Sequence, residues 1–562
     1  MTGKQLGVTE EKLEYAYDLL GRLTQEVTAD GALSYEYDPL SNLTTLTLPD
    51  GRKVNHLYYG SGHLHQLNLD GQVISDMERD DLHREVYRTQ GKLTSCFGYD
   101  AMGRKAWQFA STLPAEKLSQ VHNTGINTSL LVEHAYNPVH RRYQYDPAGE
   151  LVRTLDKLRG EIKYEYEANG QLHSRDTGSL VGSEEFRYDA AANRLNFNTS
   201  QFDKVKDNRI RQWRDQEYRY DPWGNLIEKR SGHSKLQSFV YDCENRLVRA
   251  ETLVNGKLEG TGEYRYDSLG RRVAKQSEIN GKAEQKRFLW QGLRMLREEV
   301  PGQSSLYLYE PGSYAPLARV DQAEGEEQKL YYFHTDQIGT PLEMTDSEGE
   351  IVWQATYRSW GEIEQLEVND VEQNLRFQGQ YFDSETSLHY NTFRYYDPEV
   401  GRFSTQDPIG LNGGFNLYQY APNPSSWIDP WGWMPFWKPL KPDGMGHHPF
   451  PRAHANAHGF PELGTKLDSP SWIPNELEGS DKLHQQFHEA IKKEGVPFNS
   501  KFEGTSDELI KKLDKAYEGF PQKGTLKIPR SGQVLAKDVT IGEALTKSLG
   551  KGPGNSSAGG CG

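Results

Sequence analysis

The chain has 562 residues, of which 35% are hydrophobic, and it carries a formal net charge of −15 at pH 7. Its mean hydropathy is −0.81. This length predicts several domains or one long repeat array. There is no apolar run of about 18 residues, so no membrane span is predicted, and the first residues lack the pattern of a signal peptide. The cysteines, Cys96, Cys243 and Cys561, are far apart, so the sequence supports neither a disulfide framework nor a cysteine zinc site.

Charge divides the chain near residue 433. From Met434 onward there are 17 basic and 15 acidic residues, a net charge of +2, so the remaining 48 basic and 65 acidic residues give the first part −17. An acidic body is a poor binder of nucleic acid, whereas the near-neutral tail is less strongly repelled by phosphate. Six of the 17 histidines also lie in the tail.

A repeated motif dominates residues 10–275 and predicts a repeat architecture. Its unit is an aromatic residue, any residue, Tyr and Asp, followed after a few residues by Gly or Asn, a basic or polar residue, and Leu. The clear copies are YAYDLLGRL (15–23), YEYDPLSNL (35–43), YQYDPAGEL (143–151), YEYEANGQL (164–172), FRYDAAANRL (186–195), YRYDPWGNL (218–226), FVYDCENRL (239–247) and YRYDSLGRRV (264–273).

Each unit predicts a β-hairpin. Alternating aromatic residues favour a strand, Asp-Pro or Asp-x-x-Gly favours a turn, and the following Leu begins the next strand. A single hairpin is marginally stable in water, so the hairpins must pair edge to edge into larger sheets. The Tyr-Asp pairs are therefore interpreted as scaffold and not as catalytic groups.

These repeats resemble the YD repeats of Rhs proteins, of insecticidal toxin-complex C subunits and of the teneurin shell. The segments YYFHTDQIGTPLEMTDSEGEIVWQATYRSWGE (331–362) and LRFQGQYFDSETSLHYNTFRYYDPEVGRFSTQDPIGL (375–411) resemble the end of the Rhs core. The resemblance implies a mainly β fold in which residues 1–374 form a spiral of hairpins, a hollow shell or cocoon. Residues 375–433 would be the core-associated segment, and residues 434–562 the enclosed toxin domain.

Two Asp-Pro-x-Gly motifs lie 22 residues apart, at Asp407 and Asp429, just before the composition changes. Each motif predicts a turn. The resemblance implies aspartyl autoproteolysis after the second motif, at the Trp433–Met434 bond, with Arg402 as a supporting charge. Two neighbouring carboxylates can share a proton, so that one acts as an acid and the other as a base on water.

The tail predicts a small α+β domain. Residues 480–495 and 505–519 have the pattern of helices, and Gly495 ends the first. Thr505 and Glu508 have the spacing of a capping box at the start of the second. Residues 539–552 predict a third helix.

Histidines in this tail predict a metal-dependent nuclease. His484 and His488 are four residues apart on a predicted helix and can bind one ion. His447 can supply a third ligand, His448 a general base, and Asn475 a hydrogen bond that orients the base. Arg452 can bind phosphate.

The order of these residues resembles the HNH, or ββα-metal, nucleases and the GHH-type toxins. The resemblance implies a divalent ion, which could be Zn, Mg, Mn or Ni, and hydrolysis of phosphodiester bonds. We expect DNA to be preferred to RNA as the substrate, a choice that the sequence leaves open. The resemblance also implies a cognate immunity protein, secretion spike and chaperone proteins, synthesis in a bacterial cytoplasm and type VI secretion into the cytoplasm of a target cell. The alternatives are an ADP-ribosyltransferase or other nucleotide-modifying toxin, and a non-enzymatic shell or adhesion protein.

Overall fold

The computed structural model describes residues 2–4, 10–60, 62–123, 132–196, 204–433, 436–437, 471–474, 480–496, 505–527 and 534–549. The chain forms two compact units, the first containing residues 1–99 and 105–438 and the second containing residues 100–104 and 439–562. The first unit is built almost entirely from antiparallel strands, so the predicted mainly β class is confirmed.

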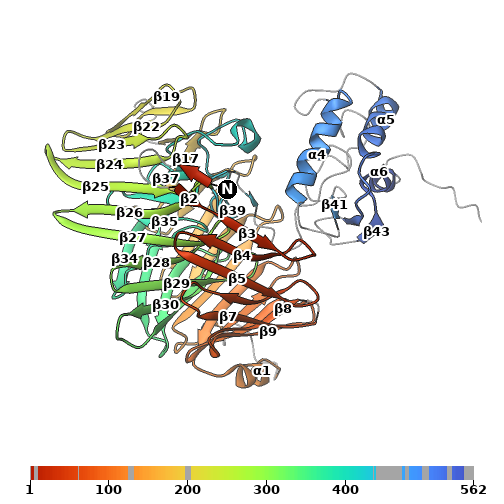
Figure 1. Cartoon of the computed structure of the whole chain (residues 1–562), viewed down its shortest axis with the longest axis horizontal. Helices are drawn as coiled ribbons and strands as arrows, with labels where there is room; N and C mark the ends of the chain where they lie inside the picture. Colours follow the sequence, from red (N-terminus) through yellow and green to blue (C-terminus); the bar gives the residue numbers. More distant parts are fainter. Residues whose placement is uncertain are drawn as a thin grey trace, which may run out of the picture. The chain divides into compact units, whose positions relative to one another are not determined.

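The first large sheet is a meander of 16 strands, β3 to β18, in which every strand pairs with its neighbours in sequence. Figure 1 shows its first strands in red and orange. The helix α1 (Ala115–Asn123) lies in the connection between β12 and β13. The strands are β3 (Glu14–Tyr17), β4 (Leu23–Thr28), β5 (Gly31–Tyr37), β6 (Leu43–Thr47), β7 (Lys53–Tyr59), β8 (His63–Leu69), β9 (Gln72–Arg79), β10 (Glu85–Gln90), β11 (Leu93–Tyr99), β12 (Lys105–Ser111), β13 (Val139–Tyr145), β14 (Leu151–Asp156), β15 (Gly160–Tyr166), β16 (Leu172–Asp176), β17 (Glu184–Tyr188) and β18 (Arg194–Asn196).

The second large sheet repeats this arrangement with 16 further strands, β19 to β34, again in sequence order. They are β19 (Lys204–Lys206), β20 (Arg209–Trp213), β21 (Gln216–Tyr220), β22 (Leu226–Ser231), β23 (Lys235–Tyr241), β24 (Leu247–Val254), β25 (Lys257–Tyr266), β26 (Arg272–Ile279), β27 (Lys282–Gln291), β28 (Arg294–Val300), β29 (Gln303–Tyr309), β30 (Pro316–Ala323), β31 (Lys329–Thr335), β32 (Pro341–Asp346), β33 (Ile351–Tyr357) and β34 (Ile363–Asn369). A two-stranded pair, β1 (Thr2–Lys4) and β2 (Glu10–Lys12), precedes both sheets.

Where a repeat has aspartate after its second tyrosine, that aspartate organises the turn that follows. Oδ1 of Asp18 accepts hydrogen bonds from the backbone N–H groups of Leu20 and Arg22, both at 2.9 Å, while its Oδ2 accepts one from Nε of Arg22 at 2.6 Å. Gly21 takes φ = +79° in this turn, a conformation that glycine adopts without strain. The same pattern of carboxylate bonds recurs at Asp80, Asp242 and Asp267.

The second tyrosine of each repeat ties neighbouring hairpins together. In several repeats its hydroxyl donates to a backbone carbonyl of the preceding repeat, as from Tyr37 to Leu23 at 2.8 Å. Tyr166 and Tyr266 bond in the same way to Leu151 and Leu247, each at 2.6 Å. The Tyr-Asp pairs are therefore scaffold, as predicted.

The two large sheets pack on each other through an apolar layer between β5–β9 and β27–β31, in which Leu67 and Met77 face Leu306 and Leu317. Charged pairs flank this layer. Arg271 of the second sheet binds Glu26 of the first at 2.7 Å. Other contacts of this kind join Arg297 to Asp50, Arg88 to Glu310, and Arg159 to Glu343.

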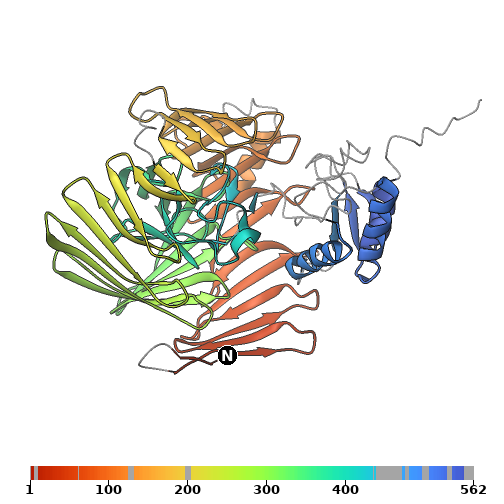
Figure 2. The same cartoon turned by 90° about the horizontal axis from the view of Figure 1, so that it is seen from above.

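Residues 375–433 pack against one face of the second sheet, as the teal segment in Figure 2 shows. Their strands are β35 (Tyr381–Asp383), β36 (Leu388–Asn391), β37 (Arg394–Asp397), β38 (Arg402–Phe403) and β39 (Trp427–Ile428), with a 3-10 helix η1 (Gly410–Gly413). β39 pairs with β40 (Phe436–Trp437). Leu388, Tyr390 and Tyr395 complete the core of the sheet.

Buried ion pairs hold this segment in place. Lys275 of β26 donates to Asp383 and Glu385, each at 3.0 Å, and Arg272 binds the same Asp383. Lys229 of β22 is held in the same manner by a second Asp-x-Glu pair, Asp397 and Glu399. Removing one partner of a buried ion pair leaves an uncompensated charge.

We expect Asp383→Ala to destabilise the first unit by about 3–5 kcal/mol, because Arg272 and Lys275 would both lose a buried partner. The midpoint of urea unfolding, followed by tryptophan fluorescence, measures this change. Glu251→Ala is the matched control: its pair with Arg249 is exposed, and its loss should cost below about 1 kcal/mol. Equal shifts for the two variants would contradict the expectation.

The second unit combines helices with one small sheet. Its elements are β41 (Ser471–Pro474), α4 (Ser480–Lys493), α5 (Ser506–Tyr517), β42 (Gly524–Lys527), β43 (Val534–Val539) and α6 (Ile541–Leu549), with the strands in the order β41-β42-β43. Trp472, Phe487 and Leu513 belong to its core. The three predicted helices and the Thr505–Glu508 capping box are confirmed. No helix within the described ranges is long and apolar enough to cross a membrane.

Candidate functional site

The two Asp-Pro-x-Gly motifs meet at one arginine. The first follows β38 and the second follows β39. Nη2 of Arg394, at the start of β37, lies 3.1 Å from Oδ2 of Asp407 and 3.4 Å from Oδ2 of Asp429. Two carboxylates that are 22 residues apart in sequence therefore share one guanidinium, and the predicted aspartate pair exists as a spatial cluster.

Arg402 does not belong to this cluster, contrary to the prediction. Its guanidinium lies over the ring of Tyr418, 4.9 Å from the centroid, and donates to Asn193 and to the carbonyl of Asn208. These contacts attach β38 to the end of the first sheet at Asn193 and to the first hairpin of the second sheet at Asn208. Arg394 takes the expected place of Arg402 as the charge beside the two aspartates.

The second motif forms the same turn as the repeats, with one substitution. Oδ1 of Asp429 accepts the backbone N–H of Trp433 at 3.0 Å, four residues on, as in the repeat turns, and Gly432 takes φ = +70°. In the turns at Asp18 and Asp267 the residue four positions on is arginine and binds Oδ2 of the aspartate. Trp433 cannot do this, and Oδ2 of Asp429 instead contacts Arg394.

Close contacts bring the Trp433 carbonyl to the other aspartate. A Cβ placed on Gly413 would come within 2.2 Å of Oδ2 of Asp407 and 2.7 Å of the carbonyl oxygen of Trp433. Both oxygens therefore border Gly413, in the 3-10 helix after the first motif. The predicted scissile bond begins at this carbonyl, so one aspartate lies beside the carbonyl and the other binds the amide of the same residue.

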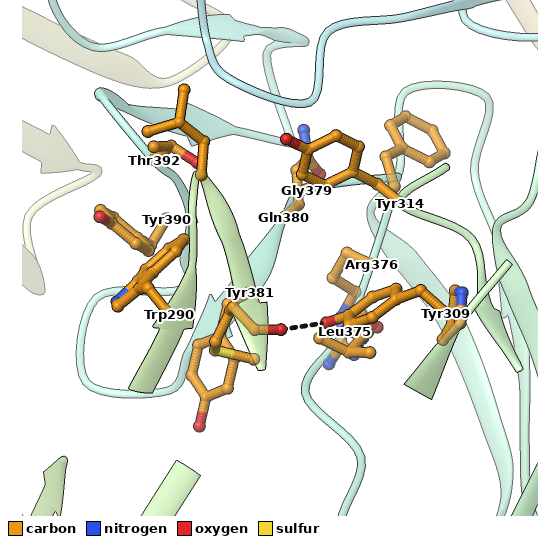
Figure 3. A pocket seen from close by; sticks show the side chains of 14 residues that line it. Trp290, Tyr309, Tyr314, Leu375, Arg376, Gly379, Gln380, Tyr381, Tyr390 and Thr392 are labelled. Carbon is orange, nitrogen blue, oxygen red and sulfur yellow. Dashed lines mark hydrogen bonds between the residues drawn. The ribbon is translucent and has the colours of Figure 1, made fainter. Parts of the chain in front are cut away.

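Residues at the turn between β36 and β37 hold the backbone of the second motif in place. Asn391 donates from Nδ2 to the carbonyl of Asp429 at 2.8 Å, and Arg394 donates from Nε to the carbonyl of Gly432. Gly379 approaches Pro430 so closely that a Cβ would lie 2.1 Å from its carbonyl oxygen. Figure 3 shows Gly379 and Thr392 in the wall of a small pocket that is lined by aromatic, aliphatic and polar residues.

Burial governs the protonation of the cluster. The side chain of Asp429 has no exposed surface, and burial raises its pKa to about 6 although Arg394 partly offsets the effect. Burial also raises the pKa of Asp407 and lowers that of Arg394. A single bound proton leaves one carboxylate opposite one guanidinium, a neutral set that low-dielectric surroundings favour. The pair is best described by one shared proton.

The histidine site cannot be assembled from the described residues. His447, His448, Arg452, Asn475 and also Met434 lie outside them. Helix α4 places positions 484 and 488 one turn apart, as two ligands on one helix require. Among the side chains that the structure describes, no three histidine, cysteine, aspartate or glutamate groups are arranged to hold a metal. The metal site and the ββα-metal type of the tail remain predictions.

Comparison with known proteins gives matches along both units. The teneurin YD-shell family model matches residues 144–424, the RHS repeat model residues 13–53, and the toxin protein PT1 model residues 443–551.

Three curated relatives are similar over about three quarters of the chain. Double-stranded DNA deaminase toxin A of Burkholderia cenocepacia is 42% identical over 77% of this chain, and toxin protein Tse5 of Pseudomonas aeruginosa is 33% identical over 76%. A protein named probable deoxyribonuclease RhsA, of Dickeya dadantii, is 29% identical over 75%. The matches cover 31%, 36% and 29% of these relatives, so the chain spans about a third of their length.

Solved structures of toxin-complex proteins share the fold. The Tc holotoxin pore of Photorhabdus luminescens matches 76% of this chain and 23% of its own, with a TM-score of 0.54. The crystal structure of TcdB2-TccC3-TEV matches 75% of this chain and 24% of its own, with a TM-score of 0.52. Sequence identity is 18% in both cases, so these likenesses concern the fold alone.

Proposed function

Because the chain belongs to the Rhs family of YD-repeat toxins, we propose that it is a toxin precursor that cuts its own backbone between Trp433 and Met434. One observation carries this proposal: Arg394 holds Asp407 and Asp429 together while Asp429 binds the amide of Trp433. The catalytic groups and the residue before the bond thus lie in one cluster of a single compact unit.

The shared proton suits the cluster to peptide hydrolysis. The ionised aspartate takes a proton from water as the water oxygen attacks the Trp433 carbonyl carbon. The protonated aspartate supplies a proton, which ends on the departing nitrogen of Met434 when the C–N bond breaks. The products are a carboxyl group on Trp433 and an amine on Met434, and the single proton on the pair is restored. Arg394 keeps the carboxylates together and balances their charge.

The direct test is the mass of the purified protein. We expect two chains, residues 1–433 and residues 434–562, on a denaturing gel and in intact-mass spectrometry. A single chain of full mass after prolonged incubation of the folded protein would reject the proposal. A cut at any bond other than Trp433–Met434 would reject the assignment of the cluster.

We expect the rate of self-cleavage to fall as the pH rises above about 6. The reaction needs the proton that the pair shares, and the pKa of Asp429 is about 6, so loss of this proton should slow cleavage about ten-fold per pH unit above that value. Timed samples of freshly translated protein, transferred into buffers between pH 5 and 9, measure the profile. A rate that rises steadily through this range would contradict a shared-proton mechanism.

For the tail we propose metal-dependent hydrolysis of nucleic acid, DNA rather than RNA. The spacing of positions 484 and 488 on α4 supports this proposal. The match of residues 443–551 to the toxin protein PT1 model supports a toxin role for the tail and names no activity. His447, His484 and His488 would hold a divalent ion, Zn, Mg, Mn or Ni, which would polarise the phosphodiester. His448 would take the proton from the attacking water, Asn475 would orient His448, and Arg452 would bind a phosphate oxygen.

The similarity of the repeat unit does not fix the chemistry of the tail. The relatives that match about three quarters of this chain are named for different activities, a DNA deaminase toxin in one case and a deoxyribonuclease in another. We therefore rest the nuclease proposal on the tail's own residues. We also propose, from the family, type VI secretion from the bacterial cytoplasm into that of a target cell with spike and chaperone proteins, and neutralisation by a cognate immunity protein.

A further inference from the structure

The side chain of Trp433 lies on a preformed aromatic surface. The ring of Phe393 stacks on it with centroids 4.3 Å apart and planes inclined by 17°, and the ring of Trp431 meets it edge-on at 6.1 Å. Phe393 belongs to the turn between β36 and β37, beside Arg394. One turn therefore carries both the arginine of the aspartate pair and the ring that contacts the residue before the predicted cut.

Hydrogen bonds fix the turn between β36 and β37 to the segment that contains Trp431 and Trp433. The backbone N–H of Phe393 donates to the carbonyl of Trp431 at 3.2 Å, and the indole N–H of Trp431 donates to the hydroxyl of Tyr314. The position of the Phe393 ring is thus set by backbone contacts and not by Trp433 alone. Such a surface is ordered before the reaction, and pre-ordered groups hold a substrate near its reacting geometry.

The aromatic surface contacts the face of the Trp433 ring and does not bind the indole N–H group. The indole Nε1 of Trp433 is buried and has no hydrogen-bond partner within the described part of the chain. The main-chain groups of the same residue are placed separately: Asp429 binds its N–H, and Gly413 borders its carbonyl. A flat aromatic side chain at position 433 would stack on the ring of Phe393, whereas a small side chain would leave that ring without a packing partner.

We propose, on the basis of the proposed self-cleavage, that Phe393 is a specificity-determining residue that selects an aromatic side chain immediately before the scissile bond. Phe393 touches the side chain of that residue and not the reacting atoms. It acts by holding Trp433 so that its carbonyl stays beside Gly413, which Asp407 also borders. Its removal should therefore change which residue is preferred at position 433, and leave the proton chemistry of Asp407 and Asp429 as it was.

The test is a matrix of full-length variants made by cell-free translation, with the rate of appearance of the 434–562 chain as the measurement. Trp433 is replaced by Phe, Leu and Ala, each in the natural background and in Phe393→Ala. With Phe393 present we expect the rates to rank Trp and Phe above Leu, and Leu above Ala, across a span of about ten-fold or more. In Phe393→Ala the ranking should collapse to within about two- to three-fold, and Phe393→Tyr should restore it.

One control variant and the behaviour of the natural chain separate the possible failures. Tyr136→Ala removes a remote aromatic side chain that is 87% exposed, and it should leave the rate and the ranking unchanged. If the natural chain does not cleave at all, the proposed function itself has failed. If it cleaves, and Phe393→Ala slows every variant at position 433 by one common factor or leaves the ranking intact, Phe393 only supports the fold and the specificity proposal is overturned. A changed pH profile in Phe393→Ala would also overturn it.

Discussion

Asp429→Asn should leave the chain in one piece. Asparagine has nearly the shape of aspartate and keeps an oxygen for the Trp433 amide, which Asp429 now binds at 3.0 Å, but it can neither carry nor accept the shared proton. Loss of such a group costs about a hundred- to ten-thousand-fold in rate. Timed gels of freshly translated protein should show only the full-length band where the natural chain gives two.

The control for this variant is Asp242→Asn, which makes the same chemical change in a repeat turn. Asp242 binds Arg246 and the local backbone and lies outside the cluster, so cleavage should proceed at its normal rate. Near-ultraviolet circular dichroism shows whether both variants keep their packing. Two bands from a folded Asp429→Asn protein would remove Asp429 from the reaction and leave the composition change at residue 433 as an ordinary domain boundary.

The repeat unit could be predicted from sequence because its causes are local. The contacts that shape each repeat lie within one repeat or between adjacent ones. They are an aspartate that binds backbone groups two and four residues on, a residue with positive φ, and a tyrosine that bonds to the neighbouring repeat. The packing of the two sheets could not be predicted in this way. Glu26 and Arg271, which meet at the sheet interface, are separated by some 245 residues, and nothing in either repeat indicates the other.

The aspartate pair was predictable and its arginine was not. Asp407 and Asp429 lie in two identical four-residue patterns, which made them conspicuous. Arg394 precedes a Tyr-Tyr-Asp-Pro sequence and has the appearance of a repeat residue, whereas Arg402 is close to Asp407 in sequence. β37 and β38 pair with Asp397 opposite Arg402, and Arg402 extends to Asn193 and Asn208 while Arg394 contacts the aspartates. Only the strand register distinguishes the two arginines.

The cluster also suggests how a scaffold motif acquires chemistry. In the turn at Asp267, Arg271 four residues on binds Oδ2, and a carboxylate with such a partner is a structural group. With Trp433 at that place, the equivalent oxygen of Asp429 is left to a shared arginine in a fully buried site, and its pKa rises to about 6. The tryptophan at position 433, the arginine shared with Asp407 and the full burial of the site together distinguish Asp429 from the aspartates of the repeat turns.

His448→Ala should abolish cutting of nucleic acid by the tail while metal binding persists. Under the proposed assignment His448 accepts a proton and is not a ligand, and removal of a general base typically costs about a hundred- to ten-thousand-fold. Cutting is measured with purified residues 434–562 on supercoiled plasmid and on RNA, with and without EDTA. Bound metal is measured on the same samples by elemental analysis.

Two companion variants make this pattern specific. His488→Ala should lower both metal content and cutting, because it removes one of about three protein ligands, and Asn475→Ala should slow cutting with little loss of metal, because it orients His448 and does not touch the ion. The tail has its own compact core around Trp472, Phe487 and Leu513, against which folding of each variant can be checked by tryptophan fluorescence. If His448→Ala cuts at the natural rate, His448 is not the general base, and His454, His458 and Glu489 become the next candidates for that role. Cutting that survives EDTA at full rate would remove the metal from the proposal, and with it the reason for pairing His484 with His488.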